Sequence, residues 1–90
     1  MTPERVEAGI AAQPAAFDVR GAARDARLDR LLVVRVGPGW SRVAPAQRAM
    51  AAEAWRSLWR EASPSGVLAI VDADGRSLVD FDARGRARVR

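Results

Sequence analysis

An amphipathic helix over residues 45–62 is the strongest structural signal in the sequence and limits what the chain can fold into. Successive residues of a helix are about 100° apart. On this spacing six apolar side chains share one arc, opposite the charged ones: Ala51, Ala54, Trp55, Leu58, Trp59 and Ala62. Pro45 suits the first helical position, and Ser63-Pro64-Ser65-Gly66 ends the helix. Because such a helix has to bury its apolar side, the flanking segments have to supply a sheet.

The segment before this helix is predicted to be a strand. Residues 31–36, Leu-Leu-Val-Val-Arg-Val, form an almost continuous aliphatic run that ends at Gly37-Pro38-Gly39. Runs of this kind are typical of strands in the middle of a sheet. We therefore expect a central strand that is covered on both faces.

Two hairpins are expected after the helix. The first joins residues 67–72 to residues 77–82, because the Asp74-Gly75 pair is typical of a two-residue turn. This register places two apolar pairs on the side that faces the core: Leu68 with Phe81, and Ile70 with Val79.

The second hairpin is predicted to turn at residues 83–85, with Gly85 in the left-handed region. A three-residue loop keeps apolar residues opposite apolar residues, whereas a two-residue loop would place Phe81 opposite Arg88. The expected pairs are Phe81 with Ala87, Val79 with Val89, Asp82 with Arg86, and Asp80 with Arg88.

A short helix is expected at the N-terminus. Thr2-Pro3-Glu4 is typical of a helix start, and Val6 and Ile10 lie one turn apart in a helix that ends near Ala12. Residues 1–14 are therefore interpreted as a peripheral helical segment, which packs on this domain or on another chain.

The next residues carry weaker signals. Residues 16–20 alternate like a short strand, and a loop or a helical turn follows to residue 30. The segment FDVRGAAR at 17–24 matches FDARGRAR at 81–88 at six of eight positions. A true repeat would give both segments the same strand and turn.

These elements predict one small α+β domain over residues 1–90, in the order helix, strand, strand, helix and three strands. The main helix packs on a mostly antiparallel sheet that ends in a three-stranded meander. It covers the face that carries Leu68, Ile70, Val79, Phe81 and Val89. This element order is similar to that of roadblock and longin-type domains, which are small interaction scaffolds, although no residue motif accompanies the similarity.

The residue types present argue against catalysis. The chain contains no Cys, no His and no Lys, so it lacks the usual nucleophile, base and thiolate ligands. Four aspartates lie close together in the sequence, but the expected hairpin register directs them apart, and their spacing is not that of a calcium loop: Asp72, Asp74, Asp80 and Asp82. We expect no enzymatic activity, no metal and no cofactor.

The sequence also lacks a signal peptide and any apolar run long enough to span a bilayer. This predicts a cytoplasmic protein without a membrane partner.

The three tryptophans are the candidate partner-binding residues: Trp40, Trp55 and Trp59. In one interpretation Trp55 and Trp59 pack on the sheet, because two Phe and no Tyr are available to fill the core. In the other, one of them stays partly exposed together with Trp40 and anchors a protein partner. The leading hypothesis is a non-catalytic protein-interaction module that acts as a homodimer or as a small subunit of an assembly.

The alternative hypothesis is weak nucleic-acid binding by the C-terminal tail. All 15 basic residues are Arg, and four of them lie in the last seven residues, which contain no acid: Arg84, Arg86, Arg88 and Arg90. Residues 1–83 are neutral, so the net charge of +4 resides in the tail. In a strand, alternate arginines are about 7 Å apart, which suits a phosphate backbone. The expected register nevertheless pairs two of them with Asp80 and Asp82.

Overall fold

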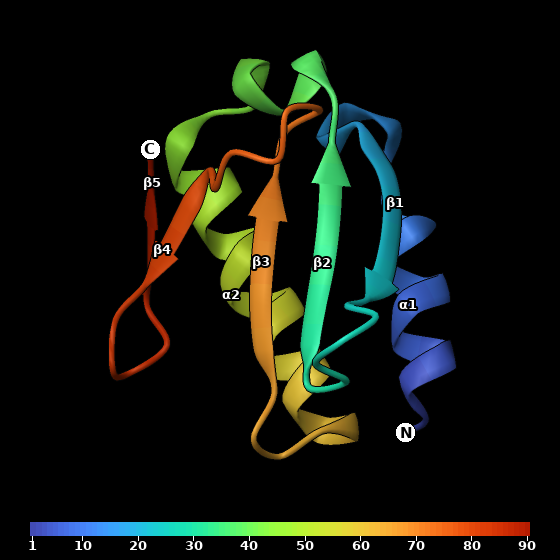
Figure 1. The fold of residues 1–90 in the computed structure, drawn as a ribbon. Helices are drawn as coiled ribbons and strands as arrows, with labels where there is room; N and C mark the ends of the chain where they lie inside the picture. The colour runs from blue at the N-terminus through green and yellow to red at the C-terminus, as the bar shows by residue number, and fades with distance from the viewer.

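The computed structural model describes all 90 residues and shows a small α+β domain (Figure 1). Two α-helices and five strands follow one another in the expected order, with two short 3-10 helices between them: α1 Pro3–Ala11, η1 Ala15–Phe17, β1 Val19–Arg24, β2 Leu31–Val36, η2 Pro38–Arg42, α2 Pro45–Ala62, β3 Val67–Val71, β4 Val79–Phe81 and β5 Ala87–Val89. The expected bounds of α2 are confirmed at both ends. The helix start at Thr2 is also confirmed, since its Oγ1 accepts the N–H of Arg5 at 3.3 Å.

Strands β1, β2 and β3 form one sheet, in which β2 has the central position expected for it. β1 is antiparallel to β2, whereas β3 is parallel to β2, with Leu32 opposite Leu68 and Val34 opposite Ile70. A parallel pair needs a long crossover connection. α2 provides it by running back along the sheet from the end of β2 to the start of β3 (Figure 1).

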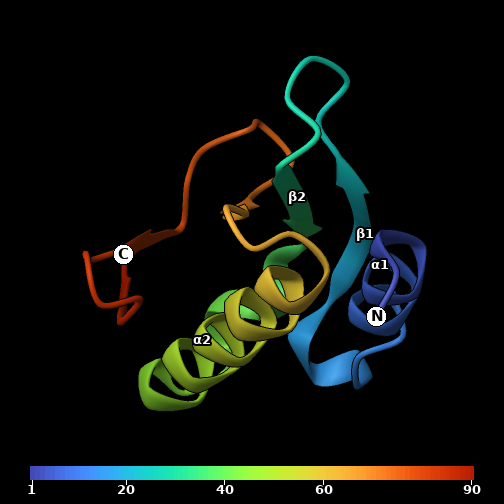
Figure 2. The ribbon, with the colours of Figure 1, turned by 90° about the horizontal axis from the view of Figure 1, so that it is seen from below.

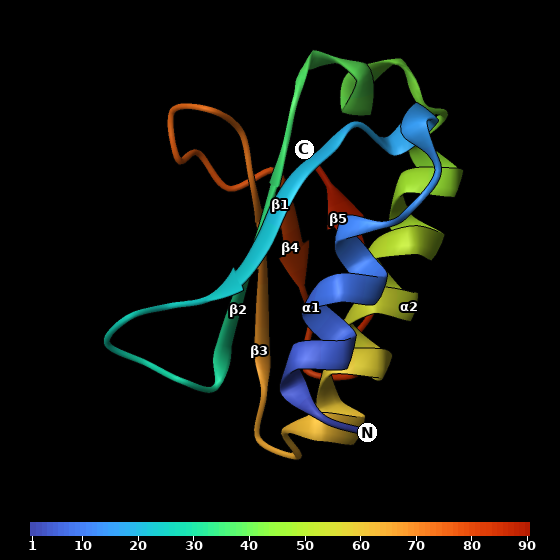
Figure 3. The same ribbon diagram turned by 90° about the vertical axis from the view of Figure 1, so that its right-hand side faces the viewer.

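Both α-helices pack on the same face of this sheet (Figure 2 and Figure 3). The core between them and the sheet contains twelve buried side chains: Val6, Ile10, Leu32, Val34, Val36, Trp40, Ala52, Trp55, Trp59, Leu68, Ile70 and Val79. The Val6 and Ile10 side chains of α1 have no exposed surface. α1 therefore contributes two side chains to this core and packs on its own domain.

The turn of the first hairpin has three residues, 73–75, instead of the expected two. Asp72 Oδ1 accepts the backbone N–H groups of Asp74 and Arg76 at 2.9 and 3.0 Å. Gly75 adopts the left-handed conformation that follows, with φ 81°. The hydrogen bonds to Asp72 therefore stabilise a three-residue loop, one residue longer than the loop that the Asp-Gly pair alone predicts.

This longer loop shifts the first hairpin by one residue. Val71 lies opposite Ser77, and neither expected pair forms: Leu68 with Phe81, or Ile70 with Val79. After this single bridge the chain leaves β3, and β4 pairs only with β5 in a second sheet. The expected meander is thus interrupted between β3 and β4.

The second hairpin has the expected register: Val79 with Val89, Asp80 with Arg88, and Phe81 with Ala87. Its turn has the same construction as the first, because Asp82 Oδ1 accepts the N–H groups of Arg84 and Arg86 at 2.8 and 3.0 Å. Gly85 has the same φ of 81° as Gly75. The two turns share the sequence Asp-Ala-x-Gly-Arg.

β1 begins at Val19, later than expected, because Phe17 belongs to η1. Asp18 separates the two elements with a left-handed φ of 54°. Its carboxylate accepts the N–H of Gly39 at 2.8 Å, and its carbonyl accepts the N–H of Gly37 at 2.9 Å. The similar segments at 17–24 and 81–88 therefore do not form the same strand and turn.

Candidate interaction surface

One face of the three-stranded sheet is covered by no other element of the chain (Figure 3). We define this open face by six aliphatic side chains: Ala23, Leu31, Val33, Val67, Ala69 and Val71. Side chains alternate along each strand, so the residues between them point into the core. The expectation that β2 is covered on both faces is therefore wrong, because Leu31 and Val33 stay partly exposed and Arg35 is exposed.

This composition is unusual for a sheet face in water. Such faces normally carry polar residues, yet Arg35 is the only charged residue that β2 and β3 place on the open face. Four large apolar side chains of the chain are exposed, and two of them lie on this side: Val67 at 44% and Leu28 in the β1–β2 loop at 42%. Contiguous exposed apolar surface of this kind marks contact sites.

Two loops project on the side of the open face, one at each end (Figure 2 and Figure 3). The β1–β2 loop, residues 25–30, lies at the end formed by Leu31 and Val67. The β3–β4 loop, residues 72–78, follows Val71 at the end where Arg35 lies. The open face is therefore bordered by one loop at each end.

Arg35 carries the free charge at the second of these ends. Its Nη2 lies 2.8 Å from the position that a Cβ on Gly21 would take, so the side chain crosses over β1. The neighbouring Arg20 pairs with Asp18 at 2.7 Å, whereas Arg35 forms no ion pair. Arg20 and Arg35 together line a hollow of about 290 Å³.

Asp29 is the corresponding free charge in the β1–β2 loop. Asp25 accepts two N–H groups of the loop backbone, at 2.9 and 3.0 Å. The Arg30 guanidinium donates to the carbonyl of Ser65 at 3.4 Å. The carboxylate of Asp29 has neither a hydrogen-bond partner nor an ion-pair partner.

All three candidate tryptophans lie in the core. Trp40, Trp55 and Trp59 are 1%, 3% and 0% exposed. The interpretation in which Trp55 and Trp59 pack on the sheet is therefore confirmed, and the alternative, in which one of them stays exposed with Trp40 as a partner anchor, is wrong. Trp40 and Trp55 pack with Phe17 in a cluster whose ring centroids are 5.8 to 6.2 Å apart. Trp59 Nε1 donates to the carbonyl of Arg30 at 2.8 Å. The chain uses these rings as core because it has few other large apolar side chains.

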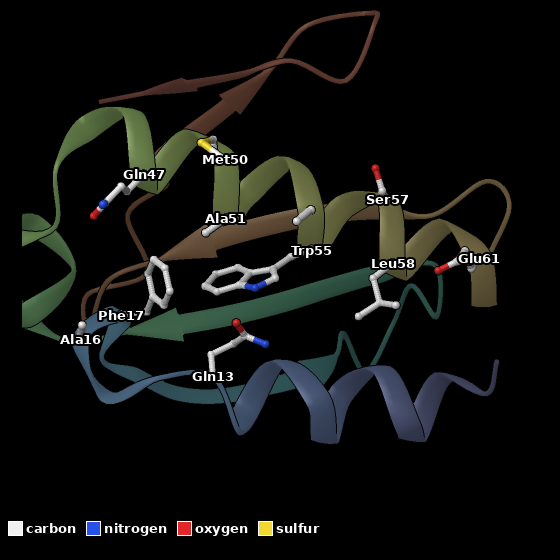
Figure 4. A pocket seen from close by; sticks show the side chains of 11 residues that line it. Gln13, Ala16, Phe17, Gln47, Met50, Ala51, Trp55, Ser57, Leu58 and Glu61 are labelled. Atoms are coloured by element: carbon white, nitrogen blue, oxygen red, sulfur yellow. The ribbon is translucent and has the colours of Figure 1, made fainter.

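A groove of about 910 Å³ separates α2 from η1 and the end of α1 (Figure 4). Phe17, Trp55 and Leu58 contribute apolar surface to it, Gln13 enters it from the end of α1, and Met50 lies at its rim with 71% of its surface exposed. Since Trp55 is 3% exposed, the groove is a shallow continuation of the core packing rather than a separate chamber.

The C-terminal arginines do not share one environment. Arg90 donates to both carboxylate oxygens of Asp80, at 2.8 and 2.7 Å. These bonds lower the pKa of Asp80 and raise the pKa of Arg90. Asp82 caps its turn instead of pairing with a guanidinium, and the remaining tail arginines form no ion pair: Arg84, Arg86 and Arg88.

No protein-family model, curated protein or solved structure matches this chain. The similarity of element order to roadblock and longin-type domains therefore has no matched structure behind it. No group of three His, Cys, Asp or Glu side chains is placed to hold a metal ion. None of the helices is long and apolar enough to cross a membrane.

The open face was not among the candidate sites that the sequence suggested, although its signal was present. Both Leu31–Val36 and Val67–Val71 are aliphatic on both faces, which predicts cover on both sides. The sequence pattern of a strand does not show on which face of the sheet the helices pack, so it does not show that one face stays open.

Proposed function

We propose that this chain is a non-catalytic protein-interaction module that functions as a homodimer or as a small subunit of an assembly. The observation that carries the proposal is the open face, which has the composition of a buried surface and no covering element in its own chain. A second polypeptide that packs on the open face buries the aliphatic side chains that β2 and β3 expose there.

The size of the open face sets the strength of this association. Over the five paired residues of each strand, three strands about 4.8 Å apart, at about 3.3 Å per residue, present roughly 240 Å² in projection. At about 25 cal/mol per Å², covering that area contributes at most roughly 6 kcal/mol from each partner, because Gly21 and Arg35 occupy part of it. The association cost is about 4–15 kcal/mol. The face therefore favours a reversible complex, in which contacts from the bordering loops add to the affinity.

The polar groups of the chain support a non-catalytic role because most of them have structural partners. Eight of the 11 carboxylates accept hydrogen bonds from backbone N–H groups or from arginines: Glu4, Glu7, Asp18, Asp25, Glu53, Asp72, Asp80 and Asp82. The chain has neither His nor Lys, which are the usual general bases for activating a serine or threonine hydroxyl.

The proposal is tested by solution mass, measured by size-exclusion chromatography with light scattering over a range of protein concentrations. Val33→Asp places a charge in the middle of the open face, and Met50→Asp is the matched control, since Met50 is 71% exposed on α2. We expect the larger species to disappear in Val33→Asp and to persist in Met50→Asp. A wild type that is monomeric at every concentration would contradict the homodimer form of the proposal, and dimers of equal mass in all three proteins would exclude the open face as the interface.

A second candidate function is weak nucleic-acid binding by the C-terminal hairpin. The observation in its favour is that Arg84, Arg86 and Arg88 are exposed and free of ion pairs. The double variant Arg84→Glu/Arg88→Glu should abolish salt-dependent binding of a labelled single-stranded oligonucleotide in fluorescence anisotropy, because each phosphate contact is electrostatic. Arg5→Glu is the matched control on α1, and equal binding by both variants would exclude the hairpin.

A further inference from the structure

We infer that the open face is covered by a second copy of this chain, related by a two-fold axis that lies in the plane of the face and runs across the strands. This inference rests on the proposed function and names both the partner and its orientation. In this arrangement the strands of the two copies run in opposite directions, and Arg35 of each copy meets Asp29 of the other.

The apolar part of the open face is complementary to itself. Its side chains are aliphatic and include the small residues Ala23 and Ala69, while Gly21 has no side chain at all. A sheet face with aliphatic and small side chains can pack against another sheet at the usual separation of about 10 Å. Leu28 belongs to the β1–β2 loop, which projects on this side of the sheet (Figure 3), and its 42% exposed surface adds apolar area beyond the edge of the sheet.

The charges of the open face select the orientation of the second copy. Arg35 and the Asp29 loop lie at opposite ends of β2, since Leu31 and Arg35 are about 13 Å apart along an extended strand. Neither residue forms an ion pair within its own chain. A two-fold axis across the strands places each cation at the end where the other copy carries its free carboxylate, and it does so twice, as an isologous interface requires.

The bordering loops contain a second complementary pair. Arg27 lies in the β1–β2 loop and Asp74 in the β3–β4 loop, and neither forms an ion pair. The same axis brings the β1–β2 loop of one copy to the end of the face where the other copy has its β3–β4 loop. An axis along the strands would instead place Arg35 against Arg35 and Asp29 against Asp29, which costs free energy.

A charge exchange tests both the partner and the orientation. The full-length chain is measured by sedimentation equilibrium from about 1 to about 500 µM, a range that spans micromolar dissociation constants. The variants are Arg35→Asp, Asp29→Arg and the double variant that carries both changes. Arg5→Asp, at an exposed position on α1, is the matched control, and circular dichroism verifies that each variant is folded.

We expect each single exchange to raise the dimer dissociation constant at least about tenfold, because two charge pairs are lost per dimer. The double variant restores the opposite charges in exchanged positions, so its dissociation constant returns to within about threefold of the wild type. Arg5→Asp leaves the constant unchanged.

Three results would overturn the inference, and they differ in what they mean for the proposed function. Single exchanges that weaken the dimer without rescue in the double variant exclude this orientation but leave the open face as the interface. A dimer that is insensitive to Val33→Asp excludes the open face as the interface and places self-association on another surface of the chain. A chain that remains monomeric at every concentration excludes a second copy as the partner.

Discussion

The two faces of the β1–β2–β3 sheet are made from alternating residues of the same strands, yet they have opposite environments. Along β2 the face toward the helices is at most 2% exposed: Leu32, Val34 and Val36. The other face carries Leu31 and Val33, which are just as apolar and stay partly exposed. Apart from Arg35, residue type therefore does not distinguish the two faces of β2. The chain has the composition of a protein with a layer on each side of the sheet, but it forms only one of those layers.

The connections explain why all the cover lies on one side. α2 is the crossover between β2 and β3 and therefore follows one face. α1 joins it there, because Val6 and Ile10 enter the same core and Glu7 accepts the N–H of Arg24 at 2.9 Å. The C-terminal hairpin is held beside α2 by Glu53, which accepts the N–H of Ala87 at 2.9 Å. None of residues 1–90 packs on the open face (Figure 3).

The largest expected difference between the two faces is in the response to a buried charge. Val33 and Val34 are adjacent and chemically identical, and they point to opposite faces. We expect Val34→Asp to unfold the domain, since an unpaired carboxylate in the core costs several kcal/mol out of a total stability of about 5–10 kcal/mol. Val33→Asp should keep the native far-UV circular dichroism and lose only association.

Urea denaturation of both variants, at a concentration where the wild type is monomeric, measures this difference. Similar losses of stability in the two variants would mean that the open face is as important for folding as the core face. The distinction between the two faces would then fail.

The second prediction concerns Asp18, between η1 and β1, and the dependence of the unfolding free energy on pH. Hydrogen bonds from the Arg20 guanidinium and from the Gly39 N–H lower the pKa of the Asp18 carboxyl. A carboxyl whose pKa is lower in the folded state binds a proton more readily when unfolded, so its stabilising effect is present above the unfolded value of about 4 and is lost as the pH falls through the folded value.

We therefore expect the free energy of unfolding to fall below about pH 4 in the wild type. Asp18→Asn retains a residue that tolerates the left-handed conformation, and it should reduce this dependence. Asp74→Asn is the control, because the Asp74 carboxylate has no hydrogen-bond partner. Parallel curves of unfolding free energy against pH for Asp18→Asn and the wild type would show that the ionisation of Asp18 does not contribute to stability.

The parts of the fold that could be predicted from sequence are those that local rules determine. The bounds of α2 follow from Pro45 and from the Ser-Pro-Ser-Gly stop, and the β4–β5 register follows from keeping Phe81 and Val79 opposite apolar residues. The Asp-Gly pair alone predicts a register that is one residue out, because Asp72 caps the turn and lengthens the loop. The repeated sequence Asp-Ala-x-Gly-Arg predicts the same three-residue loop in both hairpins. In each turn the aspartate accepts the N–H groups of the residues two and four positions later.

The candidate site could not be predicted from sequence for a different reason. Whether Trp55, Trp59 or Val33 is exposed depends on where other elements pack, and periodicity describes only one element at a time. The tryptophans are the largest apolar side chains of the protein, and all three are buried in the core. Leu31 and Val33 of β2 face the other side of the sheet and stay partly exposed. Their exposure can be predicted only when the side of the sheet on which each helix packs is known.

The smallest expected effect comes from Gly21, and it separates the charge on the open face from the apolar surface. A Cβ at this position would lie 2.8 Å from Arg35 Nη2, the flexible end of a long side chain, and meets no backbone atom. Gly21→Ala should therefore leave stability within about 0.5–1 kcal/mol of the wild type, with the lower chain entropy of Ala in the unfolded state as a small gain. The displaced guanidinium is expected to raise the dimer dissociation constant about two- to threefold by sedimentation equilibrium.

A double-mutant cycle tests whether the effect of Gly21→Ala on the dimer acts through Arg35. If it does, Gly21→Ala has no further effect in an Arg35→Ala background, because the cycle reports only the shared interaction. A full effect of Gly21→Ala in that background would instead show that the close approach of the two sheets, and not the position of the guanidinium, makes Gly21 important for the interface.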